Sequence, residues 1–170
     1  MTTAFTRRKV GQRCESGALP SASTAFDGIG ASTYGGRWNS PGNRVVYTST
    51  SLALAVLEVL VHLPGQKVPK NYVAVPADIP DQLRHDFYSV TSLPTQWRSR
   101  AEHRALIGLG NAWIAHGKAV VLRVPSALIP DEENVLLNPN HPDFGQIMVQ
   151  TAQPFRLDPR IVTLLDATPP

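Results

Sequence analysis

The chain has 170 residues, of which 42% are hydrophobic and 17% charged, a composition typical of a globular protein with one domain. No stretch contains the roughly 18 uninterrupted apolar residues of a membrane-spanning helix, and the basic N-terminus lacks the apolar run of a secretory signal, so we expect a cytoplasmic protein. The single cysteine, Cys14, excludes an intramolecular disulfide and a multi-cysteine zinc site. The net charge of +3 is scattered rather than clustered, which argues against direct nucleic-acid binding.

The first part of the chain is expected to contain loops, then a strand and a helix. Residues 11–43 are rich in Gly, Ser and Thr, and predict loops and short strands that approach a ligand closely. Residues 44–48 (RVVYT) predict a strand because they are β-branched and aromatic. The sequence LALAVLEVLVH predicts a helix, capped by Thr50 or Ser51 and ended by the Pro-Gly pair at 64–65. Because nearly every face of this helix is apolar, we expect it to be buried.

In the second part of the chain, predicted strands and helices alternate less regularly. Residues 71–76 predict a strand, residues 81–93 a polar connection, and residues 97–115 a helix that Gly117 ends. Residues 118–124 (KAVVLRV) predict a well-covered strand. No GxGxxG or GxxxxGK motif follows a strand, so we expect neither a Rossmann fold nor a P-loop site. The order of elements predicts an α+β domain.

Glu58 is the most informative single residue of the sequence. It is the only side chain between Arg44 and His62 that is charged at neutral pH, and it lies within the apolar helix. Burying a carboxylate without partners is costly, so such a residue is normally paired or faces a cleft. A core ion pair with an arginine and a site role are both consistent with this pattern. We interpret His62, one helical turn later, as a structural histidine rather than a base.

Three further residues near the first strand are candidates for ligand binding. Arg37 follows two glycines, and its guanidinium suits a phosphate, although pairing with a carboxylate such as Glu58 is the alternative. If Arg37 forms that pair, Trp38 is an ordinary core aromatic. Tyr47 ends the strand, where it either stacks on a flat ring or fills the core.

The remaining polar candidates favour structural roles when they are considered singly. Ser126 follows a strand but lacks the GxSxG pattern of a hydrolase nucleophile, so turn-capping is expected. His141 lies in NPNHPDF, where bracing of the loop is favoured over ligand binding. The five histidines lack HExxH or comparable spacing, so we expect no metal site.

Two blocks of sequence together resemble a known family. GGRWNSPGNRVVYTSTSLALAVLEVLVHL and VLRVPSALIPDEENVLLNPNHPDF resemble the RES domain, which is named for Arg, Glu and Ser positions. The core motifs cover about residues 26–63 and 113–144 of a single RES domain spanning 1–170. Carried over by position, the matching residues are Arg37, Tyr47, Glu58 and Ser126.

The resemblance implies an ADP-ribosyltransferase-like fold, in which a split β-sheet with flanking helices holds NAD in a cleft of one compact α+β domain. It implies that Glu58 orients the ribose and stabilises developing positive charge, while Arg37 binds the pyrophosphate. Tyr47 would pack against the nicotinamide or ribose, and Ser126 would hydrogen-bond the ribose. Further NAD contacts are expected from Trp38, Asn39 and an N-terminal arginine, either Arg8 or its alternatives Arg7 and Arg13.

The resemblance also implies a function. Members are toxins of bacterial toxin–antitoxin pairs that deplete NAD by cleaving its nicotinamide–ribose bond, with hydrolysis or phosphorolysis as the outcome. The usual partner is an antitoxin with an Xre-like helix-turn-helix domain. One alternative is a mono-ADP-ribosyltransferase that modifies a cellular protein with NAD, and another is a non-catalytic binding module whose Glu58 forms only a core ion pair.

Overall fold

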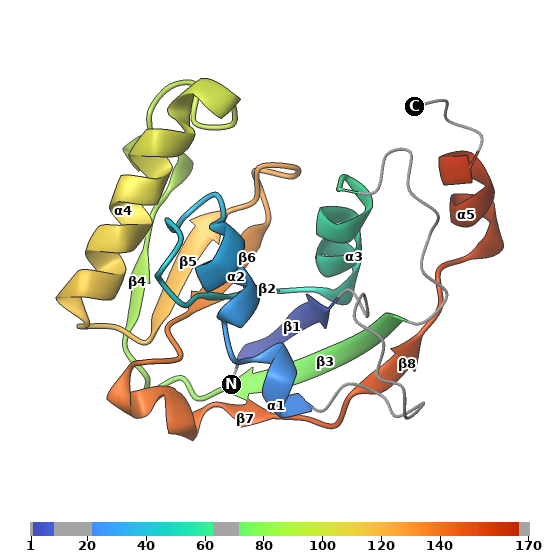
Figure 1. Ribbon diagram of the computed structural model, residues 1–170, viewed down its shortest axis with the longest axis horizontal. Helices are drawn as coiled ribbons and strands as arrows, with labels where there is room; N and C mark the ends of the chain where they lie inside the picture. Colours follow the sequence, from blue (N-terminus) through green and yellow to red (C-terminus); the bar gives the residue numbers. More distant parts are fainter. Residues whose placement is uncertain (1, 9–21, 63–71, 167–170) are drawn as a thin grey trace.

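The computed structural model describes residues 2–8, 22–62 and 72–166 (Figure 1). Its strands are β1 (Thr2–Arg8), β2 (Val46–Ser49), β3 (Tyr72–Ile79), β4 (His85–Phe87), β5 (Val121–Pro125), β6 (Glu133–Leu137), β7 (Met148–Val149) and β8 (Gln153–Phe155). Its helices are α1 (Ala22–Ala25), α2 (Ile29–Tyr34), α3 (Leu52–Leu60), α4 (His103–His116) and α5 (Pro159–Asp166), with 3₁₀ turns η1 (Val90–Ser92), η2 (Arg100–Glu102) and η3 (Pro142–Gln146). The expected α+β class is confirmed.

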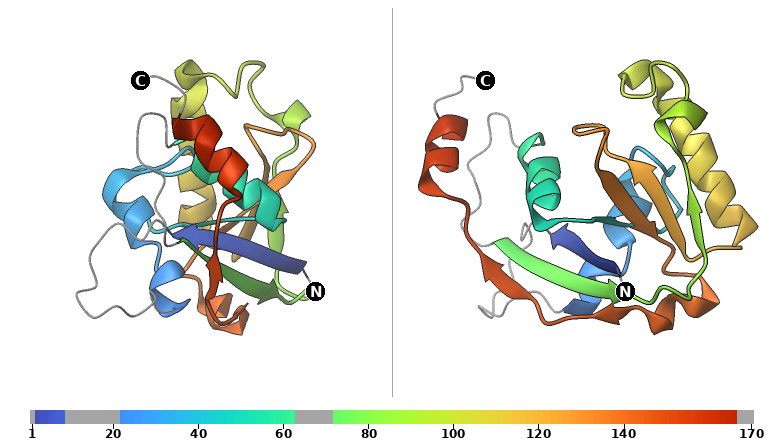
Figure 2. Two further views of the ribbon diagram at one scale, coloured as in Figure 1. Left: turned by 90° about the vertical axis from the view of Figure 1, so that its right-hand side faces the viewer. Right: turned by 180° about the vertical axis from the view of Figure 1, so that it is seen from behind.

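The strands form one eight-stranded sheet that is divided into two parts. Its order is β4-β5-β6-β2-β1-β3-β7, and β8 also pairs with β3. In the described residues the two parts meet through two residue pairs between β1 and β2, Phe5 with Ser49 and Thr6 with Thr48. The right panel of Figure 2 shows β1 and β3 lying across the molecule while β4, β5 and β6 run steeply. This is the split sheet that the family resemblance implies.

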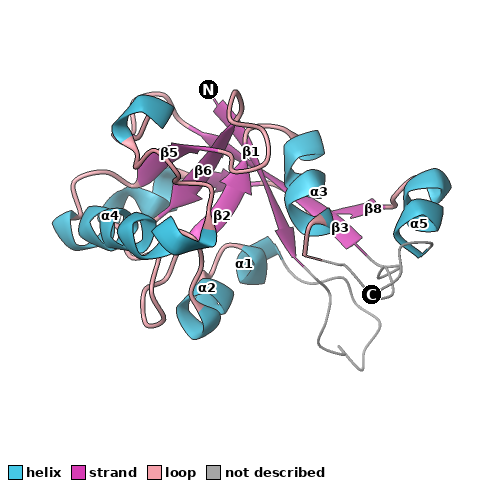
Figure 3. Ribbon diagram, turned by 90° about the horizontal axis from the view of Figure 1, so that it is seen from above, coloured by secondary structure: helices cyan, strands magenta, loops and turns pink. Residues whose placement is uncertain are grey.

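The alternation of side chains along β6 separates two hydrophobic clusters. Val135 and Leu137 belong to a cluster that includes residues of β3 and β5, whereas Leu136 belongs to a cluster with Trp113 of α4 and Trp97. The cluster around α4 therefore fills the face of the sheet that this helix covers. Seen from above, α4 and α3 lie over different parts of the sheet (Figure 3).

The helix expected over residues 97–115 is confirmed as α4, but it begins six residues later, at His103. It ends as expected at Gly117, whose φ of 56° places it in the left-handed conformation that glycine tolerates. Gly110 packs directly on the backbone carbonyl of Trp38, so that a Cβ atom would collide with it. Helix α4 thereby fixes the turn that carries Arg37.

Three expectations from the sequence are wrong. The described part of the predicted loop region contains helices α1 and α2. At the start of α2, Asp27 accepts a hydrogen bond from the backbone N–H of Ile29. The connection expected at 81–93 contains β4, which pairs in parallel with β5. Helix α3 is only partly buried, since Leu57 is 39% exposed.

The strands predicted at 44–48, 71–76 and 118–124 are confirmed as β2, β3 and β5, with shifted ends. Ser51 caps α3, because its side-chain oxygen accepts a hydrogen bond from the Leu54 N–H. The Pro-Gly pair at 64–65 and Cys14 lie outside the described residues. None of the helices in the described ranges has the length and apolar character needed to cross a membrane.

Candidate functional site

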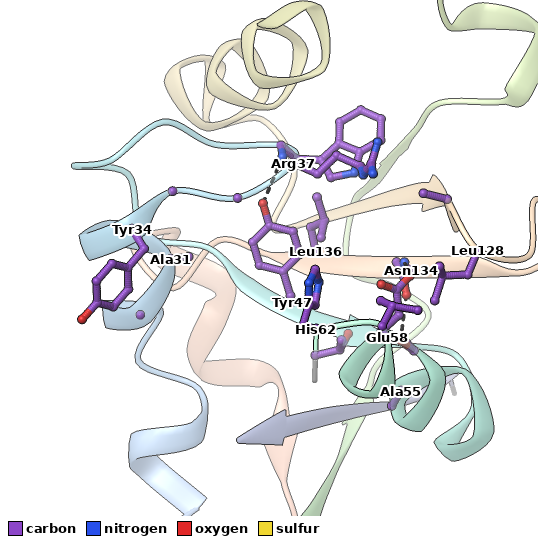
Figure 4. A pocket seen from close by; sticks show the side chains of 18 of the residues that line it. Ala31, Tyr34, Arg37, Tyr47, Ala55, Glu58, His62, Leu128, Asn134 and Leu136 are labelled. Atoms are coloured by element: carbon purple, nitrogen blue, oxygen red, sulfur yellow. Dashed lines mark hydrogen bonds between the residues drawn. The ribbon is translucent and has the colours of Figure 1, made fainter. Parts of the chain in front are cut away.

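A cavity of about 720 Å³ opens between α2, α3 and the β2–β6 part of the sheet (Figure 4). Its walls come from six regions of the chain: α2, the turn before β2, strand β2, helix α3 with the two residues after it, the start of α4 and the β5–β6 hairpin. The residues that line it are Gly30, Ala31, Tyr34, Gly35, Gly36, Arg37, Trp38, Tyr47, Thr48, Ser49, Ala55, Glu58, Val61, His62, His103, Pro125, Ala127, Leu128, Asn134 and Leu136.

Glu58 lines this cavity from the last turns of α3, and one of its two carboxylate oxygens is held. Its Oε1 atom accepts hydrogen bonds from Ser126 Oγ at 3.0 Å and from Asn134 Nδ2 at 2.7 Å. The described residues give no hydrogen bond to Oε2 and no ion pair between Glu58 and Arg37. The core arginine pair considered as an alternative for Glu58 is therefore not found among them.

Ser126 lies behind Glu58 rather than on the cavity wall. It is fully buried, and its Oγ atom accepts hydrogen bonds from the backbone N–H groups of Leu128 and Ile129 while donating to Glu58. These bonds confirm the turn-capping role. Because its single proton is directed at Glu58, the geometry favours an indirect role over the direct ribose contact expected from the resemblance.

Arg37 lines the cavity from the turn that precedes β2. Its Nη1 atom donates to the backbone oxygens of Trp97 at 3.3 Å and Arg98 at 3.4 Å. Burial lowers the pKa of Arg37, and the negative charge of Glu58 opposes that effect. An arginine retains its positive charge under such shifts. The cavity thus contains a fixed cation and a carboxylate on different walls.

Tyr47 joins strand β2 to the glycine turn. Its hydroxyl donates to Asn39 Oδ1 at 2.7 Å and accepts from the Trp38 N–H at 3.1 Å. Burial raises the pKa of Tyr47 well above its usual range, so its hydroxyl remains protonated. A Cβ atom on Gly36 would lie 2.5 Å from this hydroxyl, which explains the need for glycine there. The ring of Tyr47 forms part of the cavity wall.

Of the two neighbouring residues Trp38 and Asn39, only Trp38 lines the cavity. Asn39 is fully buried and is not among the lining residues; its Nδ2 group donates to three backbone oxygens, of Ala31, Ser40 and Asn43. This geometry favours a loop-bracing role for Asn39 over the expected NAD contact. Trp38 lines the cavity, is 3% exposed, and stacks on Tyr88 with ring centres 6.0 Å apart.

The remaining candidates from the sequence are two histidines and the N-terminal arginines. His62 follows the end of α3, is exposed and lines the cavity, and its interpretation as a structural histidine rather than a base stays a prediction. His141 braces its loop as expected, because its Nδ1 atom accepts from the Asp143 N–H. Arg7 and Arg8 belong to β1, and the structure describes their backbone only; Arg13 lies outside the described residues.

Asn134 and Ser49 are site residues that no motif of the sequence singles out. Asn134 lies in β6 and donates to Glu58, and Ser49 lies opposite it in β2. The signal for Asn134 in the sequence is weak, because it is a polar residue that directly precedes the apolar residues of ENVLL.

Comparisons with known proteins agree with the motifs described above. The family model of the RES domain matches residues 12–158. A protein of Sphingobium sp. strain YBL2 named Prs ADP-ribosylating toxin is 36% identical over 139 residues, which cover 81% of this chain and 86% of the relative. A protein of Photorhabdus laumondii named Toxin Res is also 36% identical, over 82% of this chain and 89% of its own.

A solved structure shares the fold. The crystal structure of the M. tuberculosis MbcT–MbcA toxin–antitoxin complex contains a chain that matches with a TM-score of 0.70 at 17% identity. The match covers 98% of this chain and 89% of that chain. By family model and by identity to its relatives, this chain belongs to the RES domain family.

Proposed function

We propose that this chain is the toxin of a toxin–antitoxin pair and that it consumes NAD in the cavity described above, by cleaving the nicotinamide–ribose bond. The observation that carries the proposal is Glu58, a carboxylate on the cavity wall with one oxygen fixed by two donors. The names of the Sphingobium and Photorhabdus relatives support it.

Glu58 would act through its charge. When the bond between the nicotinamide nitrogen and ribose C1′ breaks, both electrons go to the ring nitrogen and neutral nicotinamide leaves. The positive charge that the pyridinium carried then develops on the ribose as an oxocarbenium ion. A preorganised carboxylate beside the ribose stabilises that charge, and such electrostatic stabilisation is commonly the largest contribution to a rate enhancement. Water attacks C1′ and loses a proton, which gives ADP-ribose.

The other lining residues would bind and orient NAD. Arg37 offers its guanidinium to the pyrophosphate, since arginine suits phosphate oxygens in a charge-assisted geometry. Tyr47 and Trp38 supply flat apolar surface for the nicotinamide or ribose. The cavity volume of about 720 Å³ falls within the range of small-molecule sites, roughly 300–1,000 Å³. We propose that no metal ion takes part, because Glu58 itself supplies the charge that the reaction needs.

We further propose that the whole chain acts as one domain in the cytoplasm with an antitoxin partner that carries an Xre-like helix-turn-helix domain. The pairing of β1 and β8 with the same strand, β3, joins segments near both ends of the chain. The structural neighbour is itself part of a toxin–antitoxin complex, which supports a protein partner.

A second candidate function is transfer of ADP-ribose to a cellular protein. The name of the Sphingobium relative favours it, and the same residues would hold NAD in both reactions. The two reactions differ in whether water or a protein side chain attacks C1′.

Incubation with NAD labelled in its adenylate part, in the presence of a bacterial lysate, separates these reactions. Hydrolysis is expected to produce free labelled ADP-ribose, whereas transfer would produce a labelled protein band. If neither product forms and NAD is unchanged, the chain is a non-catalytic binding module and the proposal fails.

A further inference from the structure

We propose that Asn134 is a positioning residue for Glu58 and that Ser49 sets the orientation of the Asn134 amide. Asn134 and Ser126 both hold Oε1 of Glu58, which leaves Oε2 as the oxygen that meets the substrate. This inference rests on the proposed function, because it assigns a role within the same reaction.

Ser49 and Asn134 are direct partners across the β2–β6 pairing. Ser49 is 4% exposed, and its hydroxyl donates to Asn134 Oδ1 at 2.7 Å. Because that oxygen is the acceptor, the amide has one defined orientation, with its Nδ2 group towards Glu58. The Nδ2–Oε1 distance of 2.7 Å is short, as expected for a hydrogen bond to a charged acceptor.

Ser126 meets the same carboxylate oxygen from a different strand. It follows β5, and its proton is committed to Glu58 because its oxygen already accepts from two backbone N–H groups. Two donors, one in β6 and one directly after β5, therefore converge on Oε1. A glutamate has several rotatable bonds, and the two hydrogen bonds select one of its rotamers before the substrate binds.

The base of α3 is tied to the same hairpin. Ser51, the N-cap of α3, donates a hydrogen bond to Glu132 Oε2 at 3.3 Å, and the Thr50 N–H donates to the backbone oxygen of Glu133 at 3.3 Å. Helix α3 and strand β6 are thus connected at the start of the helix, through Ser51 and Thr50, and again further along the helix, through Glu58 and Asn134. A change at Asn134 is expected to alter the direction of the carboxylate more than the position of the helix.

The test uses the full chain and measures nicotinamide release over a range of NAD concentrations. Asn134→Ala is expected to lower kcat about 10- to 100-fold, the effect of losing one hydrogen bond to a charged group, with KM within about twofold of wild type. Ser49→Ala is expected to lower kcat several-fold, because the amide then loses its fixed orientation. Asn140→Ala, at an exposed asparagine after β6, is the control and should leave both constants unchanged.

Asn134→Asp adds a readout that a purely structural role would not move. The new carboxylate cannot donate to Glu58 and repels it, so kcat should fall further at neutral pH. At lower pH a protonated Asp side chain donates again, so activity relative to wild type should rise. A kcat of Asn134→Ala equal to wild type, a change confined to KM, or an Asn134→Asp pH profile parallel to wild type would each overturn the inference.

An activity-independent measurement keeps this inference separate from the proposed function. The side-chain amide resonance of Asn134 in ¹⁵N NMR spectra is expected to move in both Glu58→Gln and Ser49→Ala. If wild-type protein releases no nicotinamide but this resonance moves, the function fails while the hydrogen-bonded positioning stands. If the resonance stays in place in both variants, the positioning role is wrong even when the enzyme is active.

Discussion

Glu58 and Arg37 have opposite charges and line one cavity, yet each is held by uncharged atoms of the protein. Glu58 is bonded by a serine and an asparagine, and Arg37 by two backbone carbonyls. The described residues give no ion pair between these two charges. In the proposed function, Arg37 meets the pyrophosphate of NAD and Glu58 meets the ribose from which the positively charged ring leaves.

Arg37→Ala is expected to weaken NAD binding more than it slows the chemical step. Loss of a charge-assisted contact with the pyrophosphate is expected to raise KM about 10- to 100-fold, the range that corresponds to roughly 1.5–3 kcal/mol. Arg104→Ala, which removes an exposed arginine of α4 outside the cavity, controls for net charge. A KM unchanged by Arg37→Ala would remove Arg37 from the phosphate role.

How much of the site the sequence predicts depends on the kind of residue. Glu58 and Arg37 stand out because a charge in an apolar helix and an arginine after two glycines are local patterns. Asn134 is not predictable in this way, because its role depends on the register that places Ser49 beside it across 85 residues of chain. Ser126 is predicted as a site residue by resemblance, but its burial behind Glu58 is a property of the fold.

At the scale of elements, local signals predict the long segments and fail for the short ones. The β-branched runs of β2 and β5 and the glycine stop of α4 are encoded locally, and the structure confirms them. Helices α1 and α2 have four and six residues, too short for a periodic pattern, and β4 has three. These short elements form because neighbours supply their contacts, such as the β5 strand that pairs with β4.

The contact between α4 and the arginine turn leads to a paired prediction. Gly110→Ala places a methyl group against the Trp38 carbonyl, so it should lower the free energy of unfolding by about 1–3 kcal/mol, typical of overpacking. At Gly108 an added Cβ atom meets no atom within 4 Å. Gly108→Ala should therefore raise the free energy of unfolding by about 0.5–1 kcal/mol, because alanine has the higher helix propensity. Denaturant unfolding of both variants measures the difference. Equal stabilities would show that α4 does not press on the turn.

At the scale of the whole molecule, the cavity lies between helix α3 and one part of the divided sheet. The strand residues that line it belong to β2, β5 and β6, and α3 follows β2, the strand that joins the two parts of the sheet through β1. The α+β class follows from the sequence, but the strand order does not. The pairing of β1 between β2 and β3, and of β6 between β2 and β5, depends on contacts far apart in the chain.

The stability of the whole molecule should depend on His85 at mildly acidic pH. Burial and the positive charge of Arg123 lower the pKa of His85 in the folded protein. The unfolded chain therefore binds a proton first as the pH falls below about 6.5, and folding stability decreases from that point. Above that pH His85 is neutral in both the folded and the unfolded protein, so it no longer makes the folding stability depend on pH.

His85→Gln removes this titration while keeping a polar side chain. The free energy of unfolding measured by denaturant at about pH 7.5 and pH 5.5 should fall less for the variant than for wild type. An identical loss of stability in both proteins would contradict the proposed pKa of His85.

Release of nicotinamide from NAD by purified protein, measured for wild type and Glu58→Gln side by side, tests the central claim most directly. The substitution keeps the side-chain shape and removes the charge, so the melting temperature should stay near that of wild type. We predict that wild type releases nicotinamide and that Glu58→Gln is slower by about 100-fold or more, the usual range for losing one preorganised electrostatic contact. A folded Glu58→Gln protein that releases nicotinamide at the wild-type rate would contradict the assignment of Glu58.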